Sequence, residues 1–561
     1  MPSLRLETQA SVPAALNRKR HNRPALFGFL ALCAVIALLP VAVLAGIALN
    51  GSSSEIANLI ETVLPRAALV TIELLALVAL LAGTIGVVCA WVIADFDFPG
   101  RRHLAWMLVL PIAMPTYIAA YAFVEFFHFT GPVQSALRAV TGYQSARDYW
   151  FPNVRSLGGA ALILSLVLYP YVYLAARMAF TMQSRHQADV ARSLGAAPLR
   201  VFWKVSLPMA RPAIAAGVSL ALMEALNDLG AVEYLGVRTL TFSVYNTWLA
   251  QGSLAGAAQL ACAMLVVVVA LTGTEQFARR RQRFYGGRHG GVPMHRRGVK
   301  LGGWAALAAS TTCALPALLG FAIPALVIGT FASKRLSQIA DPALGAALAS
   351  SLAIALATAT LTVLVSLALI HAGRVIKRPF AAILIRPASI GYCIPGTVLA
   401  LGLLFALGTA DNWLDGLMRA QFGVSTGLLM SGSAFGVVLA CTIRFVTLSE
   451  RSIQSGLEKI NVNLDGAARN LGQSELGAAR RVLLPLLSPA IMTAFLMVFI
   501  DTLKELPATL LLRPFGLSTL ATFVYESASR SAVEEGAVAA LCIVAAGLLP
   551  VMLLSRTSAK K

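Results

Sequence analysis

The segment DVARSLG, from Asp189 to Gly195, is followed after nine residues by VSLP, which ends at Pro208. The same arrangement returns later in the chain, where GAARNLG ends at Gly472 and VLLP ends at Pro485, again after nine residues. The two glycines are 277 residues apart, and so are the two prolines. A spacing kept this closely predicts that the chain contains two copies of one functional unit.

Strongly apolar blocks surround both copies. Of the 561 residues, 58% are hydrophobic and 12% are charged, whereas about 25% of the residues of soluble domains are charged. The blocks have about twenty residues, the length that crosses a bilayer as a helix. Because lipid permits only helices or closed barrels, and barrel strands alternate instead of forming apolar runs, the blocks predict an all-α polytopic membrane protein.

About twelve such blocks are expected, six on either side of a basic segment from Glu275 to Lys300. This segment contains eight Lys or Arg residues and several glycines, which is typical of a flexible cytoplasmic linker. The expected spans lie at about 25–49, 67–94, 103–128, 157–182, 209–230, 254–273, 302–331, 346–371, 380–408, 425–448, 486–512 and 533–555.

These blocks divide the chain into two homologous halves of six helices each. Because each half crosses the membrane an even number of times, the repeat is parallel, and both termini are expected in the cytoplasm. The first apolar run, from Ala25 to Leu49, is longer than the apolar region of a typical signal peptide, about 7–15 residues. An uncleaved anchor is therefore expected, and a cleavage site in AVLAG near Gly46 is the alternative. The expected parts are a basic N-terminus at 1–24, a first half at 25–273 with its core at about 67–273, a linker at 274–301, a second half at 302–555 with its core at about 346–555, and a tail at 556–561.

The formal net charge of +20 does not predict a nucleic-acid partner. Lys and Arg hold the cytoplasmic loops of membrane proteins inside, and no basic run here is interleaved with aromatic residues as in a nucleic-acid interface. All seven cysteines lie in apolar stretches and none form a CxxC pair. They are expected to be packed hydrophobic side chains, with no disulfide framework and no metal site.

The repeated motif has the composition of a short helix that ends in a sharp turn. Small side chains precede the glycines, at Ala191 in the first copy and at Ala467 and Ala468 in the second. Small residues let another surface approach a helix closely. Gly195 and Gly472 lack a β-carbon, so the chain can leave the helix through a left-handed turn.

The residues that follow complete a helix–turn–helix unit. Pro208 and Pro485 suit the first turn of the helix that re-enters the membrane, where no N–H partner is needed. Such a unit fits a groove on a soluble partner. An ordinary amphipathic loop is the alternative for either copy alone, but two copies at identical spacing count against it.

The repeated motif resembles the EAA loop of ATP-binding-cassette importer permeases. In both, an acid and small residues precede a glycine, and V-x-L-P follows after nine residues. In that family the loop is a coupling helix that the nucleotide-binding subunit holds. At the positions of E-A-A the first copy reads Asp189, Val190 and Ala191. The second copy begins with Gly466 and lacks the acid there, although Asp465 precedes it. The resemblance implies two ATPase-coupling loops, with the salt bridge of the second loop in doubt.

The segments ALMEALNDLGAVEYLGV, TFSVYNTW and KELPATLLLRPFG resemble the fused, double-length permeases for ferric iron. This resemblance implies a type I importer permease in the bacterial inner membrane, which passes solute by alternating access. Its implied partners are a separate ATPase subunit, in two copies, and a periplasmic or extracellular solute-binding protein. Permeases for thiamine, phosphonates or polyamines share this architecture, and an ion-coupled secondary transporter is a rival from another class.

The sequence contains no G-x-x-x-x-G-K-[ST] phosphate loop. ATP hydrolysis is therefore expected on the partner subunit, and this chain is expected neither to be an enzyme nor to bind a cofactor. The HExxH and GxSxG motifs are also missing, so a membrane enzyme has little support.

Four acidic residues mark a candidate translocation path. Glu224 lies 16 residues after Pro208, which is roughly 24 Å along a helix at 1.5 Å per residue, and Asp228 follows one turn later. At the repeat offset of 277, Glu224 corresponds to Asp501 and Asp228 to Glu505. Charges within a span usually face a cavity or a partner, and ferric iron prefers oxygen ligands. We therefore expect these acids to line a path between the halves.

Two structural alternatives exist for the acids. Lys504 lies one turn from Asp501 and would neutralise it. The acids would also suit the outer mouth of the protein, where a partner docks. No set of metal ligands is fixed by their spacing.

Overall fold

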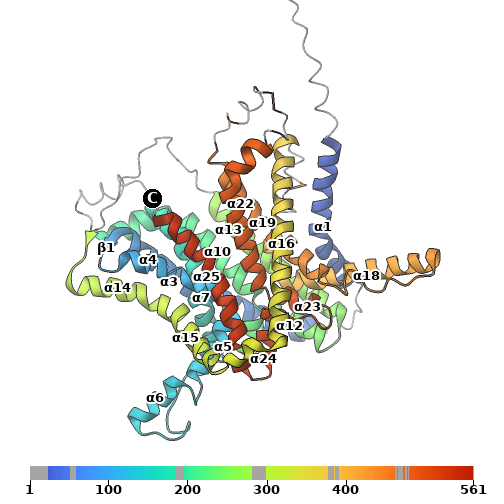
Figure 1. Ribbon diagram of the computed structural model, residues 1–561. Coiled ribbons are helices and arrows are strands. Elements are labelled where there is room, and N and C mark those ends of the chain that lie inside the picture. Colours follow the sequence, from blue (N-terminus) through green and yellow to red (C-terminus); the bar gives the residue numbers. More distant parts are fainter. Residues whose placement is uncertain are drawn as a thin grey trace, which may run out of the picture.

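The computed structural model describes residues 23–50, 59–182, 195, 197–280, 299–376, 384–385, 391–460, 464, 470, 472–473, 477 and 479–559. In this part of the chain most residues lie in helices, and short connections join them (Figure 1). Nine of the described helices are long and apolar enough to cross a membrane, and the bent pair Arg101–Ala113 and Thr116–Thr141 would make ten. The chain is therefore an all-α polytopic membrane protein, as the apolar blocks predict.

The first half of the chain runs from α1 to α13, and its helix α7 packs against α3 and α10. The helices of this half are α1 (Arg23–Leu49), α3 (Leu64–Asp95), α4 (Arg101–Met107), α5 (Thr116–Phe127), α6 (Pro132–Thr141), α7 (Leu157–Met182), α9 (Pro198–Val201), α10 (Leu207–Asn227), α11 (Gly230–Tyr234), α12 (Leu240–Leu249) and α13 (Leu254–Arg280).

The second half repeats this pattern, and its helix α19 packs against α16 and α22. A two-residue strand β1 (Phe96–Asp97) pairs in parallel with β2 (Val299–Lys300) at the start of this half. The helices are α14 (Gly303–Ala317), α15 (Ile323–Lys334), α16 (Pro342–Ile376), α18 (Gly396–Phe422), α19 (Phe435–Leu457), α22 (Leu484–Leu503), α23 (Pro507–Leu512), α24 (Leu520–Ser529) and α25 (Ala537–Ala559).

The span predicted at 103–128 is not one straight helix. It consists of α4, a 3₁₀ turn (Leu110–Ala113) and α5, and the chain bends by 99° between its two parts. Pro115 stands at the break with an extended backbone, and α5 begins at the next residue. Proline fixes φ and cannot donate a backbone hydrogen bond, so it stops the preceding helix and starts the next one.

In the second half, the spans predicted at 380–408 and 425–448 are displaced along the chain. The corresponding helices are α18, which begins only at Gly396, and α19, which begins at Phe435. Pro395 precedes α18 as Pro115 precedes α5, and a 3₁₀ turn (Gly391–Cys393) comes before it. Hydropathy alone missed the break because the residues on both sides of the proline are apolar.

Both halves contain the same irregularity at the start of the helices that lead to the four acids. A five-residue π-helical turn, Phe202–Ser206, precedes α10, and another, Ala479–Leu483, precedes α22. Each turn is followed two residues later by its proline, Pro208 or Pro485, in the first turn of the long helix. A local widening of the helix accommodates the proline, which cannot donate to the carbonyl four residues earlier.

A buried hydroxyl ties the long and short helices together in the same way in each half. The Leu240 N–H donates to Thr71 Oγ1 at 2.9 Å, and the Leu520 N–H donates to Ser351 Oγ at 2.7 Å. The two donors are 280 residues apart in the chain, and so are the two acceptors. The two halves therefore share their tertiary contacts as well as their sequence motif.

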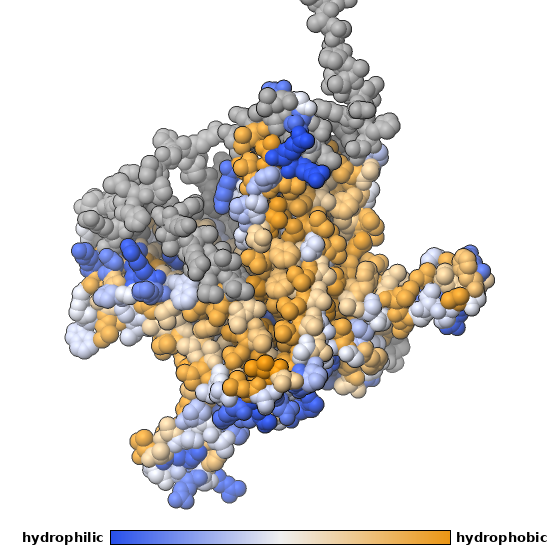
Figure 2. Space-filling model, viewed as in Figure 1, coloured by the Kyte–Doolittle hydropathy of each residue, from blue (hydrophilic) through white to orange (hydrophobic). Residues whose placement is uncertain are grey.

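The surface has the pattern of a membrane protein. Figure 2 shows an apolar band around the spanning helices, with hydrophilic residues gathered near its upper and lower edges. Helix α18 projects from the side of the body, and α6 projects from its lower end (Figure 1). Exposed leucines and valines such as Leu69, Leu80 and Val266 are therefore expected to face lipid.

Close backbone contact joins α1 to α18. A β-carbon on Gly402 of α18 would lie 2.3 Å from the Pro40 carbonyl oxygen of α1, so only glycine fits there. Small residues let helices in membranes approach to this distance. Gly408, on the same helix, would meet no atom within 4 Å.

We expect Gly402→Val to destabilise the protein by about 1–3 kcal/mol, because the added side chain pushes α1 away from α18. Gly408→Val is the matched control, and its effect is expected to stay within about 0.5 kcal/mol. Thermal unfolding of the purified protein in detergent measures both. Equal shifts in the two variants would contradict the packing of α1 on α18.

Candidate functional site

The ends of α10 and α22 meet at a cavity of about 90 Å³ between the two halves. This volume holds a few water molecules. All four acids predicted to line a path, Glu224, Asp228, Asp501 and Glu505, contribute to its lining. The polar residues that join them there are Thr116, Tyr117, Tyr171, Asn227, Arg444 and Lys504.

Asp228 and Glu505 are buried, and each fixes a sharp turn. The Ala231 N–H donates to Asp228 Oδ1 at 2.8 Å, and the Ala508 N–H donates to Glu505 Oε1 at 3.0 Å. Each carboxylate therefore caps the short helix that follows it, α11 or α23, where free N–H groups and the helix dipole favour negative charge. These two acids end the long helices at the cavity.

Glu224 and Asp501 occupy equivalent positions but have different partners. Lys504 Nζ lies 2.7 Å from Asp501 Oδ1, so the neutralisation that the sequence offered as an alternative is present in the structure. Glu224 instead accepts a hydrogen bond from the Tyr392 hydroxyl. Its other oxygen lies 4.0 Å from Nη2 of Arg444. The Glu224 side chain is 24% exposed, so it has access to the cavity.

Arg444 is the centre of the charged group. Its side chain is 6% exposed, and its Nη1 pairs with Glu505. Its Nε has no hydrogen-bond partner among the described residues. Because buried charges in a membrane are costly unless they are paired, Arg444 and the carboxylates depend on one another.

The polar contacts of Glu224 and Asn227 join the first half to the second. Tyr392 and Arg444 belong to the second half, and Glu224 belongs to the first. One turn along α10, Asn227 Oδ1 accepts a hydrogen bond from the Gly396 N–H, at the start of α18. The last turns of α10 therefore hold the second half by three polar contacts.

The charges of the cavity are distributed unequally. Among the described lining residues, the first half contributes two carboxylates and no cation, whereas the second half contributes two carboxylates and two cations. Four carboxylates against two cations leave two negative charges when all are ionised. In the described part of the chain, no group of three or more His, Cys, Asp or Glu side chains is arranged to hold a metal ion.

Sequence reasoning missed Arg444, Tyr392 and Asn227. A signal existed for Arg444, because it is the one charged residue in the span predicted at 425–448, and an ionisable residue within a span usually faces a cavity. Asn227 occupies the position equivalent to Lys504, 277 residues earlier. Tyr392 had no comparable signal, since a tyrosine in an apolar stretch is ordinary.

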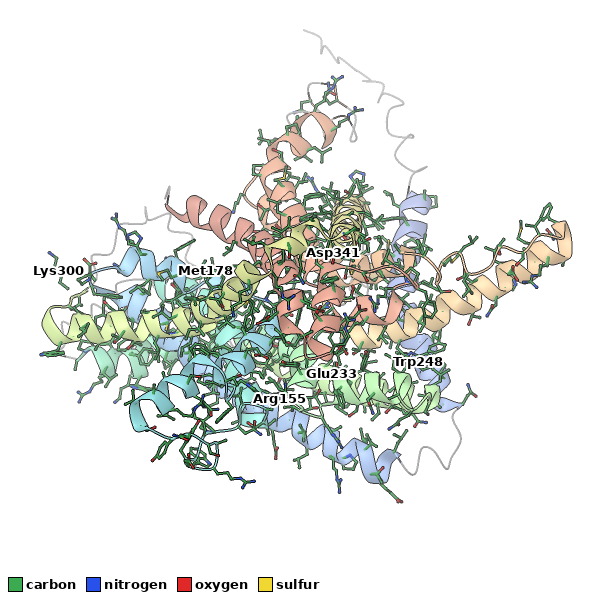
Figure 3. The ribbon with its side chains drawn as sticks, turned by 60° about the horizontal axis from the view of Figure 1, so that its bottom comes forward. Arg155, Met178, Glu233, Trp248, Lys300 and Asp341 are labelled. Carbon is green, nitrogen blue, oxygen red and sulfur yellow. The ribbon has the colours of Figure 1, made fainter. Side chains whose placement is uncertain are left out.

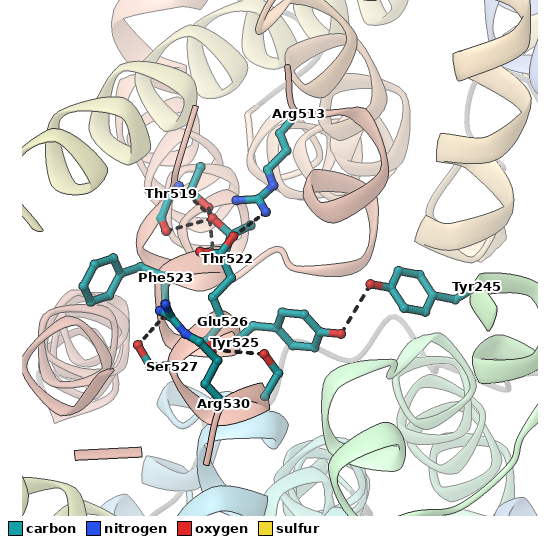
Figure 4. A network of polar contacts seen from close by, with 10 residues as sticks. Tyr245, Arg513, Thr519, Thr522, Phe523, Tyr525, Glu526, Ser527 and Arg530 are labelled. Atoms are coloured by element: carbon teal, nitrogen blue, oxygen red, sulfur yellow. Dashed lines mark hydrogen bonds and ion pairs between the residues drawn. The ribbon is translucent and has the colours of Figure 1, made fainter. Parts of the chain in front are cut away.

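A second polar layer joins the halves beyond α11. The Tyr525 hydroxyl donates to Glu233 Oε2 at 2.7 Å, and it lies 3.3 Å from the Tyr245 hydroxyl. The two tyrosines are 280 residues apart, so they are equivalent residues of α12 and α24 that meet between the halves. Figure 4 shows their hydroxyls facing one another, and Figure 3 shows Glu233 near the middle of the lower end of the molecule.

The structure describes only part of the two predicted coupling loops. Gly195 has φ +81° and Gly472 has φ +84°, the left-handed conformation that favours glycine. Asp189, Ala191, Ala467 and Ala468 lie outside the described residues. Pro208 and Pro485 lie in the first turns of α10 and α22.

Comparison with known proteins identifies the family. Residues 82–283 and 364–561 each match the binding-protein-dependent transport system inner membrane component. The chain belongs to this family. It contains two copies of the family's domain, so the permease is a double-length one, as the repeated motif predicts.

Relatives of this permease serve several solutes. The chain is 23% identical over 512 residues to the Fe(3+)-transport system permease protein FbpB 2 of Haemophilus influenzae. The aligned residues make up 87% of this chain and 89% of that protein. It is 26% identical over 221 residues to the molybdenum transport system permease protein ModB of Escherichia coli, covering 38% of this chain and 93% of ModB. The sulfate permease CysT of Salmonella typhimurium is 28% identical over 155 residues, which is 27% of this chain and 52% of CysT.

The family defines what this chain does at a coarse level. It is the multi-pass membrane component of an ATP-driven importer, a transport protein that works with a solute-binding protein and an ATPase. An ion-coupled secondary transporter, which the sequence also allowed, is therefore excluded.

We expect Tyr525→Phe to destabilise the closed arrangement of the halves by about 1–3 kcal/mol, because it removes two contacts and leaves Glu233 without its tyrosine donor. Tyr245→Phe removes one contact between neutral groups and is expected to have a smaller effect, about 1 kcal/mol. Thermal unfolding in detergent compares them, with Tyr143→Phe on an exposed loop as the control. A larger loss for Tyr245→Phe would contradict the central place of Tyr525.

Proposed function

We propose that this permease imports ferric iron. The observation that carries the proposal is the convergence of four carboxylates on the cavity between the halves, since ferric iron is a hard cation that prefers oxygen ligands. With all of these groups ionised, the cavity carries two negative charges, which favour a cation. The full-length similarity to a Fe(3+)-transport permease supports the same cargo.

An oxyanion is the second candidate cargo. Arg444 and Lys504 both line the cavity, and cations of this kind attract anions. Permeases named for sulfate and molybdenum transport match parts of the chain. Both cations already have carboxylate partners within their own half, which is why we favour the ferric ion.

The proposed mechanism is alternating access between the two halves. Two ATPase subunits bind the loops that contain Gly195 and Gly472, on the cytoplasmic side together with both termini. Their closure moves α10 and α22, and the halves separate on the opposite side to receive solute from the binding protein. Glu224, Asp228, Asp501 and Glu505 then line the path of the cargo.

Uptake of radioactive ferric iron tests the cargo directly. Cells that contain the permease, its ATPase and its binding protein are expected to accumulate iron, and cells that lack only this chain are not. Unlabelled sulfate, molybdate and 2-aminoethylphosphonate are the competitors. Inhibition of uptake by one of these anions, or equal iron uptake without the chain, would contradict ferric iron as the cargo.

We expect Gly195→Glu and Gly472→Glu each to lower transport by about tenfold, because a residue with a β-carbon pays roughly 1–2 kcal/mol in the left-handed conformation and the new charge enters the ATPase contact. Gly195→Asn is the control, since asparagine tolerates this conformation best among the other residues. Transport and co-purification of the ATPase are measured together. Full uptake in both glutamate variants would remove the coupling role from these loops.

A further inference from the structure

We propose that Arg444 is an internal competitor of the cargo for Glu224, an inference that rests on a cationic cargo. When the halves are closed, Arg444 and Tyr392 hold Glu224. When the halves separate, Glu224 loses both and becomes a ligand for the incoming cation. Closure brings Arg444 back and expels the cation from the cavity.

The geometry of Arg444 suits this role. It stays in its own half through the pair with Glu505, so it moves with α19 and α22 when the halves separate. Its Nη2 lies 4.0 Å from Glu224 of the other half, at the outer limit of an ion pair. Its Nε has no partner among the described residues. Arg444 therefore has donor capacity left for Glu224 without giving up Glu505.

Glu224 is the acid of the cavity whose partners change on opening. Asp501 keeps Lys504, which lies three residues away on the same segment. Asp228 and Glu505 keep their N–H donors in α11 and α23, since each bond lies within one half. Among the described contacts of the four acids, Glu224 alone has both of its partners, Tyr392 and Arg444, in the opposite half.

The size of the cavity makes the two cations exclude each other. A space of about 90 Å³ brings any bound cation within a few ångströms of the Arg444 guanidinium. Like charges at this separation repel strongly in surroundings of low dielectric constant. Cargo and Arg444 therefore cannot share Glu224 in the closed arrangement.

The same contacts would release the cation on closure, so no further residue is needed for its release. The approach of the two halves re-forms the hydrogen bond from Tyr392 and brings back the charge of Arg444 in one movement. The cation then meets a carboxylate whose lone pairs and charge are already engaged. Its affinity falls as the cavity closes, which is what directional transport requires.

Binding and transport of ferric iron by Arg444→Gln test the proposal. The full-length permease is reconstituted with its ATPase in nanodiscs, and radioactive ferric nitrilotriacetate is the probe. We expect Arg444→Gln to retain about tenfold more iron than the wild type, since the guanidinium charge that lies 4.0 Å from Glu224 and competes with the cation is removed. In cells, the same variant is expected to lower both KM and the maximal rate of uptake. Arg444→Lys, which keeps the charge, is expected to restore both values towards the wild type.

Matched variants separate this role from a structural one. Glu224→Gln is expected to retain about tenfold less iron and to raise KM. Arg513→Gln removes an arginine that is ion-paired with Glu526 in the same half but does not line the cavity, and its retention of iron is expected to match the wild type. Because Arg444→Gln leaves Glu505 unpaired and endangers folding, the double variant Arg444→Gln, Glu505→Gln removes the pair as a whole. It is expected to retain more iron than the wild type but less than Arg444→Gln, because it also lacks one carboxylate of the cavity.

The outcomes distinguish this inference from the proposed function. Uptake of iron by the wild type, together with unchanged or lower retention in Arg444→Gln and in the double variant, overturns the competition and leaves ferric transport standing. A loss of labelled molybdate or sulfate binding in Arg444→Gln, with a gain in Glu224→Gln, shows an anionic cargo. That result overturns both the competition and the import of ferric iron.

Discussion

The ion pair between Arg444 and Glu505 is the interaction on which the centre of this permease depends. Both side chains are almost fully buried between helices that cross the membrane, where an unpaired charge would be very costly. Glu505 also caps α23 through the Ala508 N–H, so the pair fixes the point at which α22 ends. Arg444 in turn reaches Glu224 of the other half. One buried pair therefore determines a turn, a helix end and the contact between halves.

Duplication explains the scaffold, and divergence explains the chemistry. The π-helical turns, the prolines and the hydroxyl contacts of Thr71 and Ser351 recur in both halves. The cavity does not follow this symmetry, because Lys504 stands where the first half has Asn227. A homodimer would carry the same residue on both sides of the cavity. A single chain with two halves can instead place both cations of the cavity in one half and leave the carboxylates of the other half without a cation of their own.

The sequence was sufficient to predict the elements that depend on periodicity and repetition. The offset of 277 predicted that Glu224 and Asp501 are equivalent, and both line the cavity. Apolar runs predicted the spanning helices but not the breaks at Pro115 and Pro395, because hydropathy does not register a residue that removes a backbone donor. The bonds of Glu224 to Tyr392 and of Asn227 to Gly396 join residues 168 and 169 positions apart. No local pattern contains such pairings, since they arise only when the two halves pack together.

The helix that carries Glu224 also connects the cavity to the loop at Gly195. Residues Pro198–Asn227 form a continuous helical segment of 30 residues, about 45 Å long at 1.5 Å per residue. A helix transmits a displacement at one end to the other, because its backbone bonds resist bending. Under the proposed coupling, movement at the loop is passed along this segment towards Glu224 and Asn227, where three polar contacts hold the second half. If the loop at Gly195 binds the ATPase and Glu224 binds the cargo, as proposed, both functions converge on one helix. The contacts that hold the halves together are then the ones that the driving movement has to break.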